Sequence, residues 1–542
     1  MRISHKSRLT TLVGAAALVV ASLSAIPAHA AATGPLCDGK VPVQSCAGTT
    51  ADGAAYAFQV PANFNGTVLL YSHGYRYNID IPAGIPVVGG YKITNTPEPV
   101  PGGNPAVANY FLSQGIAIMG SGFARQGWNL DSAVKTNAEL IDTFKKKFTT
   151  TTKVVAWGSS LGGIITQTLA EKYPSLVSAV APMCMADNIA AELATAGDFL
   201  WGLKTFFDPT IKGGNYSAGA AGNAEALGDI VKVLTVMSKL QAGVATGAWP
   251  DSSSATGKAL AAAGVPSRSA LLLVGLMSGL PTQSAHFDSI SGPEGALKTT
   301  FPLAISPALA VLENGANAAI LAILATQDVE LQAGGSVFDN STTDYSARVA
   351  DSAVIYNAAL SGNTAITAML GALSPANPGA PRVKATAKLS SLAATTGKIN
   401  VPTIMMTGVA DPITPAGATQ RIIDTYMTQF EAEKEAAKKA SYNGGSYIPA
   451  KSKLLAIWSV TPKSWTKFDA AGSPITTTPA APGTNHCNFT TANYLTVANF
   501  LVSAGKTGEI KWDGAARKAV RASKGLLVDP DFRAPLLKFY GE

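Results

Sequence analysis

Two kinds of segment alternate over residues 55–186 of the chain. Short runs that are almost entirely apolar predict buried β-strands, at residues 66–74, 116–122, 153–158 and 176–183. Between them lie stretches such as 131–148, which has apolar residues at helical spacing and begins with the capping-type residue Asp131. Apolar strands that alternate with helices indicate a parallel sheet covered on both faces.

This alternation stops in the middle of the chain and then resumes. Residues 187–398 are rich in Ala, Gly, Ser and Thr, with helix-like patches and no strand rhythm. After them come a strand running into a loop, a long helix, a further strand and a last long helix, at residues 401–412, 416–439, 453–460 and 491–505. We therefore expect an α/β core built from residues 31–186 and 399–542, with residues 187–398 inserted as a large, mainly helical cap.

The first thirty residues have the layout of a secretory signal peptide. A basic start is followed by a mostly apolar stretch, residues 9–26, and by the small-residue pattern Ala28-His29-Ala30. We expect cleavage after Ala30 and a secreted, extracellular protein. The alternative, a membrane anchor, is disfavoured because Thr, Ser and Gly interrupt the apolar stretch.

Composition excludes some classes of partner. Hydrophobic residues make up 47% of the chain and charged residues 14%, which is enough apolar material for a sizeable core. Beyond the leader no segment has the roughly 18 unbroken apolar residues of a spanning helix, so we expect no stable membrane insertion. The 41 Lys and Arg residues only slightly outnumber the 34 Asp and Glu residues and are scattered, which gives no indication of a nucleic-acid partner.

The chain has four cysteines, Cys37, Cys46, Cys184 and Cys487, all beyond the leader. An even number in an exported chain suggests disulfides, and four cysteines allow three pairings. A Cys37–Cys46 bond would close a small loop and leave Cys184–Cys487 as a long-range link. Because the sequence has no CxxC or HExxH motif, we expect no metal and no cofactor.

The segment Gly158-Ser159-Ser160-Leu161-Gly162 lies between an apolar strand and an apolar helix and fits the pattern G-x-S-x-G. In this pattern a sharp turn lifts the central serine above the sheet, and the residues two before and two after it must be small. That register selects Ser160. Around Ser159 the same positions hold the bulky Trp157 and Leu161, and the remaining alternative is an ordinary glycine-rich turn.

A serine hydroxyl becomes a good nucleophile when a base accepts its proton. Of five histidines, two fall in the leader, which leaves His73, His286 and His486. His486 lies in a polar loop before the last long helix and fits the chain order of serine, acid, histidine that accompanies this turn. We therefore expect His486 to be the general base.

The acid that orients the histidine should follow a strand between the serine and the histidine. Asp411 lies in the loop just after the apolar strand of the 401–412 segment and is the favoured candidate. Asp187 also follows a core strand and is the competitor. Acids in the cap, or between Asp411 and His486, such as Asp469, remain possible. The backbone N–H groups of Leu161 and Tyr75 are the expected donors to the oxyanion, since one follows the nucleophile and the other follows an early strand.

Together these motifs resemble those of the α/β-hydrolase superfamily. The matching elements are His73-Gly74-Tyr75, the turn at Ser160, the stretch around Asp411 and His486-Cys487. The resemblance implies an eight-stranded, mostly parallel sheet and an acyl-enzyme mechanism, as in secreted bacterial serine esterases and related large-capped exopeptidases. Ser159 departs from the tannase and feruloyl esterase group, which carries a cysteine there, and the interval from Asp411 to His486 is long enough to contain an insertion.

The expected function is that of a secreted serine hydrolase acting on carboxylic esters. A cap this large favours a bounded pocket and a small or medium substrate. An exopeptidase or an acyltransferase would use the same residues, and a non-catalytic binding protein would usually have lost one of them. The stretch Gly120–Arg125 suggests a dinucleotide loop but lacks the third glycine, which again indicates no cofactor.

Overall fold

We describe a computed structural model of the chain. The structure describes residues 32–533 apart from residue 40 and segments 300–302, 353–361, 374–387, 390–391, 393–394 and 443–450. The predicted signal peptide, residues 1–30, lies outside the described residues.

A ten-stranded sheet forms the core, in the order β1-β2-β3-β5-β4-β6-β7-β8-β9-β10. The strands are β1 (Thr33–Cys37), β2 (Val43–Thr49), β3 (Ala55–Pro61), β4 (Thr67–Ser72), β5 (Ala117–Ser121), β6 (Lys153–Ser159), β7 (Ala179–Met183), β8 (Thr403–Gly408), β9 (Leu454–Ser459) and β10 (Leu526–Leu527). The six strands from β5 to β9 are parallel to one another. The chain therefore has the α/β fold, with a mostly parallel central sheet, that the sequence predicts.

The sheet is wider than the eight strands that the resemblance implies. An antiparallel hairpin, β1 with β2, extends one edge, and the two-residue β10 pairs with β9 at the other. The hairpin carries polar and small residues and has only one buried side chain, Cys46, so it shows none of the apolar runs that identify the central strands. The Cys37–Cys46 disulfide joins its two strands.

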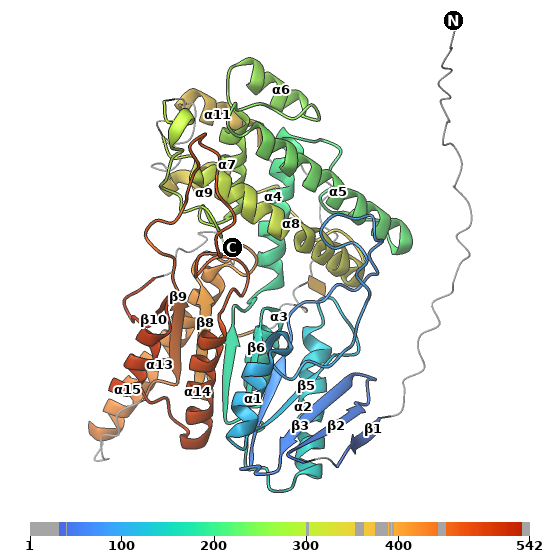
Figure 1. Ribbon diagram of the computed structural model, residues 1–542, viewed down its shortest axis with the longest axis vertical. Coiled ribbons are helices and arrows are strands. Elements are labelled where there is room, and N and C mark those ends of the chain that lie inside the picture. The colour runs from blue at the N-terminus through green and yellow to red at the C-terminus, as the bar shows by residue number, and fades with distance from the viewer. Residues whose placement is uncertain are drawn as a thin grey trace, which may run out of the picture.

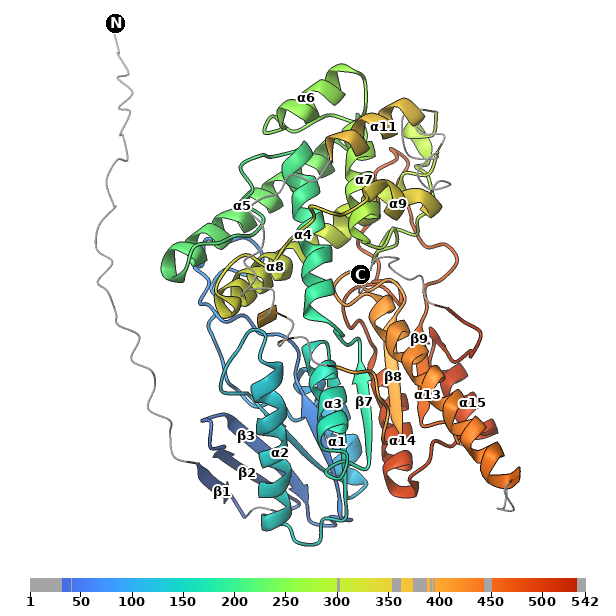
Figure 2. The ribbon, with the colours of Figure 1, turned by 180° about the vertical axis from the view of Figure 1, so that it is seen from behind.

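Helices cover both faces of the sheet. On one face pack α2 (Leu130–Lys147), α3 (Leu161–Lys172) and α13 (Ala416–Tyr442), which Figure 2 shows in front of the sheet. On the other pack α1 (Pro105–Ser113) and α14 (Thr491–Thr507), both labelled in Figure 1. The short helix α15 (Gly514–Ala522) follows α14. Side chains of one strand alternate between the two faces: Val68 and Leu70 join the first cluster, and Leu69 and Tyr71 join the second.

Side-chain caps fix where several of these helices begin. Asn104 accepts hydrogen bonds from two backbone N–H groups at the start of α1, and Asp513 caps α15. Thr490 and Asn493 form a capping box at the start of α14, each bonding the other's backbone. This capping box fixes the point at which the loop that carries His486 ends.

The inserted segment contributes a second, helical layer above the sheet (Figure 1). Its helices are α4 (Ile189–Phe206), α5 (Gly219–Gly243), α6 (Ala255–Ala262), α7 (Ser267–Ser278), α8 (Ser306–Ala333), α9 (Tyr345–Val349) and α11 (Asn363–Ala372). They share a hydrophobic cluster of their own, which also takes in Ile79 and Ile81 from the long loop after β4. The hydrophobic cluster of the cap thus contains side chains from the core as well as its own.

Among the helices of the described residues, α8 alone is long and apolar enough to cross a membrane. Most of its apolar stretch is buried inside the protein, where it packs against α4, α5 and α7. These contacts identify α8 as the central helix of the cap.

Candidate active site

A strained turn carries Ser160. Strand β6 ends at Ser159 and helix α3 begins at Leu161, and between them Ser160 has φ 60° and ψ −126°. A positive φ is costly for a residue with a side chain, and such residues cluster at functional sites. The Ser160 N–H donates to Met183 O at the end of the neighbouring strand β7, which anchors the turn to the sheet.

The glycines around this turn are sterically required. A Cβ atom on Gly158 would lie 2.1 Å from Gly162 O, and one on Gly162 would lie 1.9 Å from Ser72 O. Both contacts are with backbone atoms, which cannot rotate away. The requirement for small residues two positions before and after Ser160 therefore has a physical basis in this fold.

Ser160, His486 and Asp411 meet at the carboxyl ends of three strands. His486 Nε2 lies 2.8 Å from Ser160 Oγ. His486 Nδ1 lies 3.1 Å from Asp411 Oδ1 and 3.0 Å from Asp411 Oδ2. The imidazole thus bridges the hydroxyl and the carboxylate, the arrangement in which one ring nitrogen can accept a proton while the other is held by the acid.

The Asp411 carboxylate is buried, with 1% of its surface exposed, and is held by its own loop. Its Oδ1 accepts hydrogen bonds from the backbone N–H groups of Ile413 and Thr414, and its Oδ2 accepts one from Cys487 N–H. The Thr414 hydroxyl lies 3.2 Å from Asp411 Oδ2 and 2.9 Å from Cys184 O. Sequence reasoning missed Thr414, whose only signal is its position three residues after the acid.

The competing acids have other partners. Asp187 forms a bidentate ion pair with Arg421 of α13. Burial raises the pKa of Asp187, and Arg421 opposes that rise. Asp469 accepts hydrogen bonds from the backbone of its own exposed turn, at Ala471 N and Ser473 N. Asp411 is therefore the acid that the structure brings to His486.

The other two histidines lie in different settings. His73 is buried with Nδ1 2.7 Å from Gly74 O, and burial, helped by Arg76, lowers its pKa to about 4. His286 pairs with Glu313 in the cap, with Nδ1 2.6 Å from Glu313 Oε1.

A disulfide joins Cys184, just after β7, to Cys487, next to His486. Cys487 Sγ lies 3.5 Å from His486 Nε2. Within the described part of the chain, Asp411, His486 and Cys487 form the one group close enough to hold a metal ion. The sulfur in that group belongs to a disulfide and is not a thiolate ligand, so the group does not fit a metal site. The two disulfides of the chain are typical of extracellular proteins.

The backbone segments that carry the expected oxyanion donors adjoin the serine. Leu161 is the first residue of α3, and the first N–H groups of a helix have no partner within it. A Cβ atom on Gly74 would lie 3.2 Å from Ser160 Cβ and 3.7 Å from Ser160 Oγ. The backbone that leads into Tyr75 therefore passes directly against the nucleophile, which a larger residue at position 74 would crowd.

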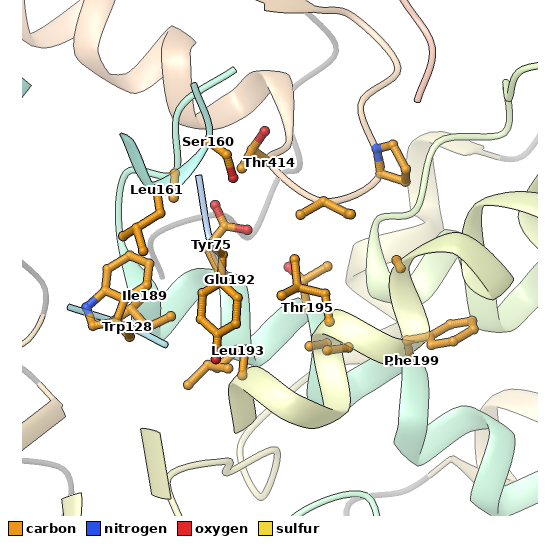
Figure 3. A pocket seen from close by; sticks show the side chains of 18 of the residues that line it. Tyr75, Trp128, Ser160, Leu161, Ile189, Glu192, Leu193, Thr195, Phe199 and Thr414 are labelled. Atoms are coloured by element: carbon orange, nitrogen blue, oxygen red, sulfur yellow. The ribbon is translucent and has the colours of Figure 1, made fainter. Parts of the chain in front are cut away.

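Ser160 opens into a largely apolar cavity that extends under the cap (Figure 3). The space, including its mouth and the open solvent there, is about 750 Å³. Its lining comprises Tyr75, Trp128, Ser160, Leu161, Ala186, Ile189, Glu192, Leu193, Thr195, Ala196, Phe199, Leu280, Ala318, Leu321, Ala322, Ala325, Pro412, Ile413 and Thr414. Among these described residues Glu192 has the one charged side chain. Helices α4 and α8 supply most of the wall, so the cap forms most of the cavity.

Comparisons with known proteins give distant likenesses. No family model matches the chain, and no curated protein matches it. Among solved structures, the rice cell wall degrading esterase LipA from Xanthomonas oryzae is 11% identical, with 89% of this chain and 98% of that chain covered and a TM-score of 0.32. An esterase from Aspergillus oryzae is 12% identical, with 77% and 72% covered and a TM-score of 0.30. Similarities this weak say nothing of the reaction, which has to be argued from the site itself.

Proposed function

We propose that the protein is an exported serine hydrolase that cleaves carboxylic esters through an acyl-enzyme. The observation that carries the proposal is the continuous contact from Ser160 Oγ through the His486 imidazole to Asp411, at the wall of an apolar cavity.

In the first half of the reaction, Ser160 Oγ attacks the ester carbonyl carbon while His486 Nε2 accepts the hydroxyl proton. The Asp411 carboxylate, held by its own loop, stabilises the imidazolium that forms. The tetrahedral intermediate then collapses. Its bond to the alcohol oxygen breaks, the alcohol leaves with the proton from His486, and the acyl group stays on Ser160.

In the second half, water takes the place of the alcohol. His486 accepts a proton from the water as its oxygen attacks the acyl carbon, and it returns that proton to Ser160 Oγ as the acid leaves. In both halves negative charge develops on the former carbonyl oxygen. The N–H groups of Leu161 and Tyr75 are the proposed donors to that oxygen.

The cavity indicates the kind of substrate. Its wall is formed mainly by Ala, Leu, Ile and Phe side chains from α4 and α8, which suits an apolar group of small or medium size. Export is proposed from the signal-peptide pattern together with the two disulfides.

A substrate panel tests the proposal. Nitrophenyl esters of increasing acyl length should be cleaved and aminoacyl and prolyl nitroanilides should not, because the apolar wall fits an acyl chain better than a charged amine. Ser159→Ala, beside the nucleophile, should retain activity, and Ser160→Ala should lose it. Cleavage of the nitroanilides alone would replace the esterase by an exopeptidase, and a product formed with an added alcohol in place of water would indicate an acyltransferase. No turnover of any substrate would favour a binding protein.

A further inference from the structure

One cap carboxylate reaches down to two loops of the core. Asp328 lies on α8 with 3% of its surface exposed. Its Oδ2 accepts a 2.6 Å hydrogen bond from Trp128 N–H and lies 3.4 Å from the Tyr75 hydroxyl, which donates to it. Its Oδ1 accepts a 2.8 Å hydrogen bond from the Asn78 side-chain amide. Asp328 thus ties the loops after β4 and β5 to the cap.

Both loops border the nucleophile. Tyr75 carries one proposed oxyanion donor, and the preceding Gly74 lies against Ser160. The side chains of Tyr75 and Trp128 also line the cavity, as do Ala322 and Ala325 of α8, the latter one turn before Asp328. Helix α8, which forms part of the cavity wall, therefore also contacts the loop that would hold the oxyanion.

The fit around Asp328 is tight. A Cβ atom on Gly127 would lie 2.4 Å from Asp328 Oδ2, so the carboxylate packs directly on the backbone of the second loop. One turn further along α8, Gln332 Nε2 donates to Trp128 O at 3.1 Å. Two side chains of one helix thus bind both the N–H and the C=O of Trp128. These two hydrogen bonds fix the position of the Trp128 backbone.

We propose that Asp328 is a positioning residue, which sets the Tyr75 loop so that its backbone N–H points at the developing oxyanion. This inference rests on the proposed esterase function. It makes the cap part of the machinery for transition-state stabilisation, in addition to its role in enclosing the substrate. Burial raises the pKa of Asp328, and its N–H donors oppose that rise, which is the expected balance for a buried carboxylate with several donors.

Asp328→Asn tests the inference because it removes the charge and keeps the size and shape of the side chain. The new amide would present N–H groups to donors that now face carboxylate oxygens, so the loop should shift. We expect kcat for a short-chain nitrophenyl ester to fall about 10- to 100-fold, less than the roughly 10²–10³-fold loss on removing an oxyanion donor outright. KM should change less than about threefold, because the cavity wall is retained. Rates are normalised to active sites titrated with a fluorophosphonate.

Glu330→Gln is the matched control. Glu330 lies two residues further on the same helix, is similarly buried, and accepts hydrogen bonds from Asn215 N and Tyr216 N within the cap. Glu330→Gln should lower thermal stability about as much as Asp328→Asn does and should leave kcat unchanged. An equal fall in kcat for the control would show that general loosening of α8 is sufficient, and would overturn the inference.

Removal of the donors provides a second line of evidence. Tyr75→Phe together with Asn78→Ala leaves Asp328 in place and takes away two of its hydrogen-bond donors, and should lower kcat as Asp328→Asn does. Combined with Asp328→Asn, the effects should be smaller than the product of the separate losses, since they disrupt one network. If Asp328→Asn fails to fold, this pair decides the matter, and an unchanged kcat overturns the inference.

The outcomes separate the inference from the function on which it rests. If the wild type neither reacts with the fluorophosphonate nor cleaves esters, the proposed function fails. If the wild type does both and folded Asp328→Asn has the same kcat, only the role of Asp328 fails.

Discussion

Two places in the described part of the molecule bring together a serine, a histidine and a carboxylate, and they differ in which member lies in the middle. In the first, the His486 ring lies between Ser160 and Asp411. In the second, at the border of the cap, the Glu313 carboxylate lies in the middle: it accepts a 2.6 Å hydrogen bond from the Ser284 hydroxyl and has His286 Nδ1 2.6 Å away.

This difference decides the chemistry. In the second group the serine proton points at the carboxylate, and His286 Nε2 lies 3.1 Å from Thr478 O, a carbonyl oxygen that can only accept. Neither ring nitrogen of His286 therefore faces the serine hydroxyl, so the ring is not placed to accept the serine proton. The group instead joins the cap to the loop around Thr478, a structural tie. Composition alone does not make a catalytic triad; the order of contacts does.

The largest expected contrast comes from the two serines. Ser160→Ala should lower kcat by about 10⁶-fold, as loss of a nucleophile does in serine hydrolases. Ser284→Ala should leave kcat within about twofold and cost stability through one lost hydrogen bond. Ester hydrolysis by both variants, at matched folded fractions, checks the pair. Equal losses would mean that the Ser284 group has a catalytic role or that Ser160 has none.

Replacement of the two carboxylates, Asp411 and Glu313, should produce a smaller difference in kcat. Asp411→Asn should lower kcat about 10⁴-fold, because the amide cannot hold the imidazole in the correct tautomer or stabilise its charged form. Glu313→Gln keeps its shape and lies outside the reacting group, so it should change the melting temperature rather than kcat. Steady-state kinetics and thermal melts distinguish these outcomes. A large kcat effect at Glu313 would contradict the structural role assigned to it.

The two disulfides differ in how close they lie to the active site. Removal of a native disulfide costs about 2–5 kcal/mol of stability, so both C184S/C487S and C37S/C46S should melt lower. Only C184S/C487S should also lose kcat, because this bond holds the residue next to His486 against the end of β7. Activity per folded molecule measures the difference. A similar kcat for both variants would show that the loop around His486 is set without the bond.

His73 provides the smallest test, one of stability and not of rate. Its pKa of about 4 in the fold lies below the 6.5 expected for an exposed histidine, so the unfolded chain binds more protons between these values. This contribution to stability is present above pH 6.5 and is lost as the pH falls towards 4, by about 3 kcal/mol at most. His73→Asn should flatten that dependence in denaturant unfolding. Identical profiles for His73→Asn and the wild type would contradict this assignment.

The core was far more predictable from sequence than the cap. Parallel strands end at one edge of a sheet, so residues placed directly after apolar strands come together there. Asp411 follows β8, and Ser160 follows β6 within a motif whose glycines the backbone requires. The strands around them were identified by their uninterrupted apolar runs.

The cap and the sheet edges gave weaker signals. Most residues of α8 are apolar, so its sequence says that the helix is interior without saying which side faces a cavity. Asp328 in such a helix gives no local sign of the loops that it holds some 200 residues away, because those contacts exist only in the folded chain. The hairpin β1–β2 was missed because few of its side chains are buried.

The most direct test of the account is to find which serine reacts. Intact wild-type protein is treated with a fluorophosphonate, digested and mapped by mass spectrometry, with Ser160→Ala and Ser284→Ala treated in parallel. The account predicts one adduct, on the peptide that contains Ser160, which is lost in Ser160→Ala and retained in Ser284→Ala. An adduct on another serine, or no adduct on folded wild type, would contradict it.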